Sequence, residues 1–374
     1  MKTTAVVVHT ADTPLTFEEL DVEPLRAHEV LVRVVGTGIC HTDLGVIATT
    51  GADDAPIVLG HEGSGIVDSV GSDVESLVPG DRVVLSYNFC TECDHCRRDL
   101  PMHCRDFAAL NLTGTRLDGS SPFSKDGTSV RGHFFGQSSW ATYAVANEQN
   151  CVKVEADVPL ELLGPLGCGI QTGAGAVLNT LHPEAGSSIA IFGVGSVGLA
   201  ALLGSVVAEC STIIAVDIAD SRLEKARDLG ATHVVNSSST DAAEAIRAIT
   251  GGVGAQYSVD CIGLPAVVRS ALECLQSPGV CATVGFQGLP NEVSFDQGHL
   301  LFGRSLVGVI EGDAIAAEFI PRMIDLYRQG RFPFDKLIDL YRFEDINAAL
   351  QAVHHGEVTK VVLTLDQGGE GHGG

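Results

Sequence analysis

Four cysteines lie close together in one stretch of the chain, at Cys90, Cys93, Cys96 and Cys104. The spacing C-x2-C-x2-C-x7-C brings four thiolates near enough to hold a tetrahedral zinc ion. An iron–sulfur cluster fits less well, because bacterial ferredoxins place the fourth cysteine after three residues and follow it with proline. Since thiolates would fill every coordination position, the spacing predicts a structural zinc site. A disulfide, or a chance cluster of thiols, is the alternative.

Three more candidate metal ligands are dispersed: Cys40 in GICHTD, His61 in GHEG and Cys168 in GPLGCG. Spacing alone does not establish a site here, because each residue taken singly is more often a buried thiol or a loop histidine. Two cysteines and one histidine, however, leave one position of a zinc ion open, as catalytic zinc requires. A carboxylate near the histidine, from Asp43 or Glu62, would orient the imidazole.

A glycine-rich turn, GVGSVG, supplies Gly193, Gly195 and Gly198 between an apolar run and a helical stretch. In a dinucleotide-binding turn these glycines permit the bend, let a pyrophosphate approach the backbone, and let helix and strand pack closely. Asp217 ends the next apolar run, where its carboxylate would accept hydrogen bonds from ribose hydroxyls and repel a 2′-phosphate. The pattern predicts NAD rather than NADP. Glycines that serve only helix packing are the alternative.

The composition describes a folded chain that carries a strong negative charge. With 374 residues, 45% of them hydrophobic, two domains are expected. The net charge of −24 should repel phosphate backbones and anionic lipids, so we expect no nucleic-acid partner and no membrane partner. Eleven cysteines, together with an N-terminal apolar run too short for a signal peptide, favour a reducing cytoplasmic location.

The elements that would position these residues follow from two patterns of apolar runs. Short runs separated by Gly, Pro and Asp over 3–154 predict an all-β unit with long loops. From 186 to 310, apolar runs alternate with helical segments, which predicts an α/β doubly wound parallel sheet. The expected strands are 188–193, 212–217, 232–236, 257–263, 280–286 and 306–310, and the expected helices include 221–229 and 266–276.

The structure expected for two further parts of the chain does not follow from these patterns alone. The uncharged stretch 185–208 has the length of a membrane span, but its glycines indicate a strand, a tight turn and a buried helix instead. A helix over 314–330 and a strand over 360–365 are expected after the sheet, and the glycine-rich residues 367–374 are expected to be disordered.

The motifs occur in an order that resembles a known family. GICHTD, LGHEGSGIV, GDRV, the four-cysteine loop, GCGIQTG and GVGSVG resemble the zinc-dependent medium-chain alcohol dehydrogenases over nearly the whole chain. The stretches 132–145, 308–313 and 326–338 are similar to its aryl-alcohol, or benzyl alcohol, dehydrogenase branch. The resemblance implies a GroES-like all-β catalytic domain in 1–170, completed by a return segment at 312–366, and a Rossmann NAD-binding domain in 171–311.

The resemblance also assigns roles to single residues. It implies that Thr42 hydrogen-bonds the substrate oxygen and starts a proton relay, that Asp43 supports a ligand, and that Glu62 lies beside the metal. Many relatives carry a histidine shortly after the residue that Asp43 matches, whereas this chain continues with Leu44, Gly45, Val46 and Ile47, so the outer end of the relay stays open. The remaining implied roles are catalytic zinc ligands at Cys40, His61 and Cys168, pyrophosphate contacts at His41 and Lys360, a ribose contact at Arg222, nicotinamide packing at Thr172 and Val197, and substrate lining at Phe134 and Phe135.

The activity implied by the resemblance is the reversible oxidation of a primary aromatic or allylic alcohol to the aldehyde, with NAD as the hydride acceptor. One catalytic and one structural zinc ion per subunit, and assembly as a homodimer or homotetramer, are implied as well. A glutathione-dependent formaldehyde dehydrogenase shares both zinc sets and is the first alternative. A non-enzymatic NAD-binding protein is the second, although all three ligands of the open site are present.

Overall fold

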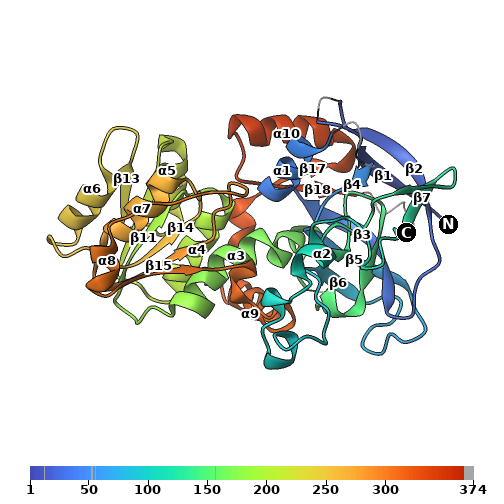
Figure 1. Cartoon of the computed structure of the whole chain (residues 1–374), viewed down its shortest axis with the longest axis horizontal. Coiled ribbons are helices and arrows are strands. Elements are labelled where there is room, and N and C mark those ends of the chain that lie inside the picture. Colours follow the sequence, from blue (N-terminus) through green and yellow to red (C-terminus); the bar gives the residue numbers. More distant parts are fainter. Residues whose placement is uncertain (12, 52–53, 55, 156, 366–374) are drawn as a thin grey trace, which may run out of the picture. The chain divides into compact units, whose positions relative to one another are not determined.

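The chain forms two compact units, shown in the computed structural model of Figure 1. Every residue is described except 12, 52, 53, 55, 156 and 366–374. The first unit comprises Met1–Cys168, Ile315–Ile324 and the chain from Ile338 onward, and the second comprises Gly169–Ala314 and Asp325–Leu337. The tail expected at 367–374 lies outside the described residues.

The bounds of the two units differ from the domain boundaries expected from the sequence. The first unit ends at Cys168 rather than 170, and the second continues to Ala314 rather than 311. The expected return segment, 312–366, is divided, because 325–337 belongs to the second unit. The physical reason is burial: Phe332, Phe334 and Leu337 are fully buried, and the turn Phe334–Leu337 packs against a helix of the second unit.

The first unit contains two β-sheets. One has the order β4-β1-β2-β7-β8, and the other has the order β10-β6-β5-β3-β18-β17, with β9 also paired to β3. The strand bounds are β1 Lys2–Val8, β2 Thr16–Val22, β3 Glu29–Gly38, β4 Ile57–Val58, β5 Gly63–Val70, β6 Arg82–Leu85, β7 Phe123–Lys125, β8 Thr128–Val130, β9 Tyr143–Asn147, β10 Cys151–Lys153, β17 Ile338–Arg342 and β18 Lys360–Thr364. The strand expected at 360–365 therefore joins a sheet formed mainly by the first half of the chain.

Helices interrupt the unit that was expected to be all-β. The first, α1 (His41–Thr49), follows Cys40 directly, and α2 (Phe107–Asn111) follows the four-cysteine stretch. Asp43 favours the start of α1, because its side chain accepts a hydrogen bond from the N–H of Cys40 in a capping box. Helix α9 (Ala316–Arg328), expected over 314–330, and α10 (Ile346–His355) follow later.

The second unit is a doubly wound α/β domain. All six strands pair in parallel in the order β13-β12-β11-β14-β15-β16, as expected for a Rossmann fold. The strands are β11 Ser188–Phe192, β12 Thr212–Asp217, β13 His233–Asn236, β14 Ala255–Asp260, β15 Leu275–Thr283 and β16 Arg304–Gly308. The helices are α3 Gly169–Gly175, α4 Ser196–Val207, α5 Asp220–Asp228, α6 Ala242–Ile249, α7 Pro265–Glu273 and α8 Gln297–Leu301. Helices α4, α5, α6 and α7 pack on the sheet (Figure 1).

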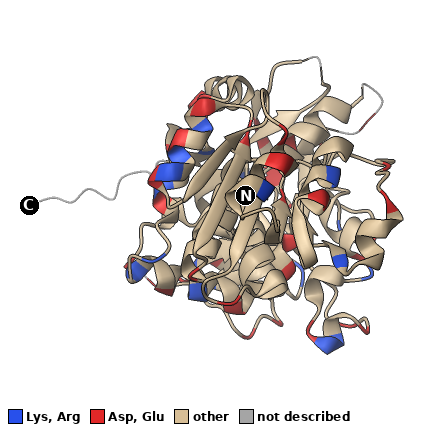
Figure 2. Ribbon diagram, turned by 90° about the vertical axis from the view of Figure 1, so that its left-hand side faces the viewer, with Lys and Arg blue, Asp and Glu red and all other residues tan. Residues whose placement is uncertain are grey.

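The uncharged stretch 185–208 forms strand β11, the glycine turn and helix α4, as expected from its glycines. Of α4, eight consecutive residues from Gly198 to Ser205 are buried, which explains why the helix lacks charge. Among the described residues, no helix has the length and apolarity that a membrane span requires. Figure 2 shows acidic and basic residues interspersed along the ribbon.

Candidate functional site

The three dispersed ligand candidates come together in the first unit. Ligand atoms of Cys40, His61, Cys168 and Glu62 all lie within 4.8 Å of one another. Cys40 precedes α1, His61 and Glu62 precede β5, and Cys168 ends the first segment of the unit. Three separate loops therefore meet at one point. His61 and Glu62 are fully buried, Cys168 is nearly so, and Cys40 is half-buried.

Asp43 links two of these loops. One carboxylate oxygen, Oδ1, lies 2.9 Å from His61 Nδ1 and accepts the N–H of Gly60 at 3.1 Å. The other, Oδ2, accepts the N–H of Cys40 at 3.0 Å. The sequence left open whether Asp43 or Glu62 orients the imidazole, and the structure places Asp43 in contact with it. Because a carboxylate accepts the proton of Nδ1, the lone pair of Nε2 is available to a metal.

The atoms that would hold the metal fit a divalent cation. His61 Nε2 is buried and has no hydrogen-bond partner among the described residues, although a buried ring nitrogen is costly to leave unpaired. It lies beside two thiols, and two thiolates with one neutral imidazole are the donor set of catalytic zinc sites. Cys40, His61 and Cys168 can therefore hold zinc, and a fourth position is free for a substrate as long as Glu62, whose ligand atom lies within 4.8 Å of theirs, stays paired with Lys360.

The electrostatics of the site favour ionised cysteine. The pKa of the Cys40 thiol lies well below its usual value, because Cys168 donates a hydrogen bond to it and the positive charges of His61 and Lys360 outweigh the cost of burial. Burial alone would lower the pKa of His61, but Asp43 and the Cys40 thiolate raise it well above its usual value. A bound cation would take the place of that proton beside the thiolates.

Glu62 forms a buried ion pair that the sequence did not predict. Lys360 Nζ donates to Glu62 Oε1 at 2.6 Å and to the carbonyl of Ile39 at 3.1 Å. Burial opposes charge on Lys360, but the Glu62 carboxylate outweighs it and raises the lysine pKa. Burial also raises the pKa of Glu62, which the Lys360 ammonium opposes. Lys360 is only 2% exposed. Its expected contact with a pyrophosphate stays a prediction.

The other residues expected near the reacting atoms lie on α1 and on the segment after His133. Thr42 Oγ1 lies 3.9 Å from Cys40 Sγ, so its hydroxyl is next to one of the candidate metal ligands. His41 is exposed at the first position of α1. Phe134 and Phe135 are both buried, and both rings contact His61, with centroids at 5.5 Å and 4.5 Å from the imidazole. Their expected role in lining a substrate pocket stays a prediction.

The four-cysteine stretch forms a second cluster within the same unit. Sulfur atoms of Cys90, Cys93, Cys96 and Cys104 lie within 4.8 Å of one another, and all four are free thiols. Backbone N–H groups of Cys93 and Cys90 donate to the sulfurs of Cys90 and Cys104, each at 3.3 Å. Backbone hydrogen bonds lower the pKa of Cys93 to about 6. These contacts favour thiolate at Cys93, whereas burial raises the pKa of Cys96 and of Cys104. Thiolate is the form that binds zinc.

The glycine turn lies between β11 and α4, as the motif requires. Gly193 has a φ of +83°, and a Cβ at Gly198 would lie 1.9 Å from the carbonyl oxygen of Gly193, so the fold itself explains these two glycines. A Cβ at Gly195 would meet nothing within 4 Å. Helix packing therefore does not account for Gly195, whereas a ligand that approaches the backbone does. This glycine fits a pyrophosphate at the N-terminus of α4.

Asp217 lies at the carboxyl end of β12, beside the glycine turn. Its Oδ2 accepts the N–H of Val194 at 2.9 Å, and its Oδ1 accepts the N–H groups of Ile218 and Ala219 at 2.8 and 3.0 Å. Arg222 Nη1 lies 3.8 Å from Asp217 Oδ1. Thr172 and Val197, the expected nicotinamide contacts, are half-buried on α3 and α4 of the same unit. Contacts of these residues with a cofactor stay predictions.

Sequence reasoning missed Gln137. This fully buried side chain donates from Nε2 to the carbonyl of His61 at 3.0 Å, and its Oε1 accepts the N–H of Gly63 at 3.0 Å. It thereby fixes the backbone on both sides of Glu62. Gln137 lies in the stretch 132–145, whose similarity to one branch of the family assigns this residue no role. Because Gln137 is followed by Ser138 and Ser139, no apolar pattern marks it as buried.

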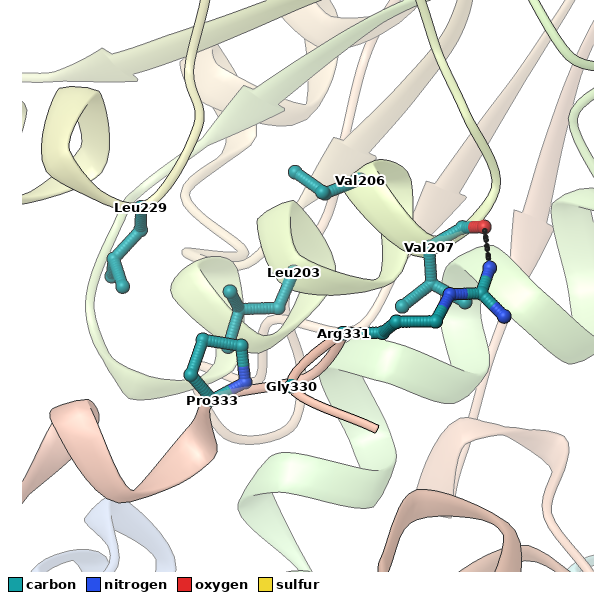
Figure 3. Close-up of a pocket in the computed structure, with 7 residues that line it drawn as sticks. All are labelled: Leu203, Val206, Val207, Leu229, Gly330, Arg331 and Pro333. Carbon is teal, nitrogen blue, oxygen red and sulfur yellow. Dashed lines mark hydrogen bonds between the residues drawn. The ribbon is translucent and has the colours of Figure 1, made fainter. Parts of the chain in front are cut away.

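A separate cavity lies in the second unit, away from these residues. It has a volume of about 210 Å³ and is lined by Leu203, Val206, Val207, Leu229, Gly330, Arg331 and Pro333 (Figure 3). The Arg331 guanidinium donates to the carbonyl of Val207 at 3.2 Å, the dashed contact in Figure 3. Since this carbonyl belongs to the last residue of α4, the arginine acts as a C-terminal cap of that helix. The lining contains no residue with a predicted role.

Comparisons with known proteins agree with this geometry. A family model described as "Alcohol dehydrogenase GroES-like domain" matches residues 26–156, and one described as "Zinc-binding dehydrogenase" matches residues 196–329. The geraniol dehydrogenase of Castellaniella defragrans is 46% identical over 96% of this chain and 97% of its own length. The alcohol dehydrogenase class-3 of Myxine glutinosa is 37% identical over 96% of this chain and 97% of its own length.

Solved structures give the same result. A crystal structure of an alcohol dehydrogenase zinc-binding domain protein from Burkholderia ambifaria matches with a TM-score of 0.95 and 46% identity. That of benzyl alcohol dehydrogenase from Acinetobacter calcoaceticus matches with a TM-score of 0.94 and 42% identity. Each comparison covers 98% of this chain and 100% of the other.

Proposed function

The chain belongs to the zinc-binding medium-chain alcohol dehydrogenases, and from that premise we propose that it oxidises a primary aromatic or allylic alcohol to the aldehyde, reversibly, with NAD as the hydride acceptor. The observation that carries the proposal is the buried set of Cys40, His61 and Cys168, in which His61 Nε2 has no hydrogen-bond partner among the described residues. The choice of substrate class is supported by relatives named geraniol dehydrogenase and benzyl alcohol dehydrogenase, at 46% and 42% identity.

In the proposed reaction, RCH2OH and NAD⁺ give RCHO, NADH and a proton. Zinc held by Cys40, His61 and Cys168 would supply a Lewis acid that lowers the pKa of the alcohol hydroxyl. Thr42 Oγ1, 3.9 Å from Cys40 Sγ, would accept the hydroxyl proton and pass it outward. His41, exposed on the same helix, is the nearest candidate in sequence for the next step of that relay.

The protein's own groups prepare the site for this chemistry. Asp43 holds the imidazole of His61 in one tautomer through Nδ1. Phe134 and Phe135 exclude water from the side of His61 that they cover, which strengthens electrostatic interactions there. We assign the cofactor as NAD because the Asp217 carboxylate, 4% exposed beside the glycine turn, would meet a 2′-phosphate with like charge.

The test is a spectrophotometric assay with benzyl alcohol and geraniol. We expect absorbance of reduced nicotinamide with NAD, a much lower rate with NADP, and loss of the rate after metal removal with recovery on adding zinc. Full activity in metal-free protein would contradict the proposal. Formaldehyde oxidised only in the presence of glutathione would favour the alternative enzyme raised by the sequence, and no activity with any alcohol would favour an NAD-binding protein without chemistry.

We further propose that the chain forms a homodimer or homotetramer, built partly by pairing of β16 edges. This is supported by the position of β16, which has β15 as its single neighbour among the described strands. Large apolar side chains are exposed in the segments next to β15 and β16, namely Phe286, Leu289, Leu301 and Phe302. Light scattering after gel filtration measures the subunit number, and a monomer would contradict the proposal.

The location and remaining partners follow from charge and thiol chemistry. We propose a cytoplasmic location, supported by eleven cysteines that are all free thiols in the described part of the chain. We expect small alcohols and aldehydes as partners, and neither nucleic acid nor membrane, because a net charge of −24 disfavours anionic surfaces.

A further inference from the structure

The imidazole of His61 is enclosed on several sides by named groups. Phe135 stacks on one face, with ring centroids 4.5 Å apart and the planes 25° from parallel. Phe134 meets it edge to face at 5.5 Å and 85°, and Asp43 holds Nδ1 at 2.9 Å. Nε2, the atom that faces the thiols of Cys40 and Cys168, is the ring nitrogen left for a metal.

The backbone presents Phe135 to the imidazole in an unusual conformation. Phe135 has a φ of +51°, and Ser138, three residues on, has a φ of +48°. Side chains such as phenylalanine rarely adopt this left-handed region, and where they do, the surrounding structure must hold them there. Such strain is most often found where a side chain has a task beyond packing.

Buried polar side chains hold this conformation in place. Asn150 Nδ2 donates to the carbonyls of Gly136 at 3.1 Å and Phe135 at 3.5 Å. Ser138 Oγ accepts the N–H of Phe134 at 2.8 Å and donates to the carbonyl of Val58 at 2.7 Å. Since Asn150 and Ser138 are at most 1% exposed, these hydrogen bonds do not compete with water.

We propose that Phe135 is a positioning residue for the metal site: its ring, held on the imidazole face of His61 by a left-handed backbone, prevents rotation of the imidazole and keeps Nε2 aimed between Cys40 and Cys168. The proposal rests on the metal site of the proposed function and extends it. It differs from substrate lining, because a lining residue changes which alcohol binds, whereas a positioning residue changes how firmly the metal is held.

Phe135→Leu tests the proposal, since leucine is apolar and buried as readily but has no ring to stack. We expect the metal of the Cys40 site to pass to a chromogenic chelator about 2- to 10-fold faster than in the wild type, the range for the loss of one aromatic pair. The absorption spectrum of the cobalt-substituted site should shift as well. Metal in the four-cysteine cluster should be released at the wild-type rate and serves as the internal reference.

Three further variants isolate the stack from general effects. Phe135→Tyr keeps the ring and should restore slow release and the wild-type cobalt spectrum. Phe343→Leu, which removes another buried ring of the same unit that meets Phe17 edge to face at 5.3 Å, should leave release unchanged. Phe135→Met, apolar and without a ring, carries the same test if the leucine variant does not fold.

The outcomes separate this inference from the function on which it rests. If Phe135→Leu and Phe135→Met release the metal at the wild-type rate with the wild-type cobalt spectrum, the inference is overturned, even where KM for benzyl alcohol rises. If the wild type nevertheless reduces NAD when benzyl alcohol is added, the proposed function stands. If the Cys168→Ser variant holds as much zinc as the wild type, both the inference and the proposed function are overturned.

Discussion

At the scale of single residues, the candidate metal site depends on one carboxylate that reaches two loops. Asp43 accepts hydrogen bonds from the N–H groups of Cys40 and Gly60 and contacts His61 Nδ1. A change at Asp43 would therefore move two ligand candidates at once. Gln137 adds a second tie to the same segment through the carbonyl of His61.

Cys168→Ser and His61→Ala should each nearly abolish turnover while NAD binding survives. Loss of the Lewis acid should lower kcat about 1,000-fold or more, because metal polarisation of a hydroxyl is worth several kcal/mol. NAD binding should persist, since the glycine turn and Asp217 belong to the other unit. Stopped-flow rates, calorimetric NAD binding and zinc content check this, and retention of wild-type rates would remove the metal from the chemistry.

Asp217→Asn should weaken discrimination between the two nicotinamide cofactors. The variant loses the charge that repels a 2′-phosphate, and its single amide oxygen can accept either from Val194 or from Ile218 and Ala219, but not from both sides. We expect the ratio of kcat/KM for NAD over NADP to fall by about tenfold or more, since charge-assisted hydrogen bonds are the stronger ones. Asp220→Asn, an exposed change three residues away, is the matched control, and an unchanged ratio in Asp217→Asn would count against the assignment.

Residue types and motifs predicted which side chains gather, but not how they contact one another. GICHTD and GHEG named Asp43 and Glu62 as equal candidates to orient the imidazole, because both are carboxylates near a ligand in sequence. Only the fold separates them. The ion pair between Glu62 and Lys360 joins residues 298 positions apart, and no local pattern encodes such a distance.

At the scale of elements, apolar periodicity located the parallel sheet well. Buried strands read as continuous apolar runs, and all six expected runs are strands of the second unit. Strand β14 begins at Ala255 and β15 at Leu275, earlier than expected, because Gln256 and Gln276 interrupt the apolar pattern. Helix α1 was not expected, since its short sequence, HTDLGVIAT, has little amphipathic pattern.

Cys93→Ser should remove the metal from the four-cysteine stretch and loosen it. Residues 90–104 contain only two short helical turns, so a metal would supply much of their order. We expect zinc content to fall by one ion per chain and Tm to fall by roughly 5 °C. Cys210→Ser, at a buried thiol of the second unit, should leave zinc content unchanged. A Cys93→Ser variant with wild-type zinc content would contradict the structural role.

Stability should fall with acid partly because of His133, which precedes the segment that carries Phe135. Burial lowers the pKa of His133 from its ordinary 6.5 to about 4, with Glu29 opposing and Arg116 reinforcing the effect. Between these two pH values, His133 binds a proton in the unfolded chain but stays neutral in the folded chain. His133 therefore costs no stability above pH 6.5, and the free energy of unfolding falls progressively as the pH falls from there to about 4.

His133→Gln removes this dependence. At pH 5, proton binding by His133 in the unfolded chain should lower the free energy of unfolding of the wild type by about 2 kcal/mol, by proton linkage. Urea unfolding at a series of pH values measures it, and the variant should lose correspondingly less stability than the wild type between pH 7 and 5. Parallel curves for the two proteins would show that His133 does not stay neutral in the fold.

At the scale of the whole molecule, charge opposes folding. The sequence carries 47 acidic against 23 basic residues, and compact structure brings these like charges closer. Salt screens repulsion between exposed charges more than a Debye length apart. We therefore expect Tm to rise as sodium chloride increases from about 0.01 M to about 0.5 M. Scanning calorimetry measures it, an equal osmolality of sucrose is the control, and a Tm that falls with salt would contradict the expectation.

The position of β18 has a consequence for biosynthesis. Strand β18 pairs with β3 in the middle of its sheet, and Lys360 at its start gives the buried Glu62 its counter-charge. The ribosome synthesises Glu62 and the strand β3 long before it reaches Lys360. Until then, β3 lacks the pairing partner β18 along one edge, and Glu62 lacks the counter-charge of Lys360. Closure of this sheet and the pairing of Glu62 with Lys360 should accordingly follow synthesis of the last strand, however early the first strands fold.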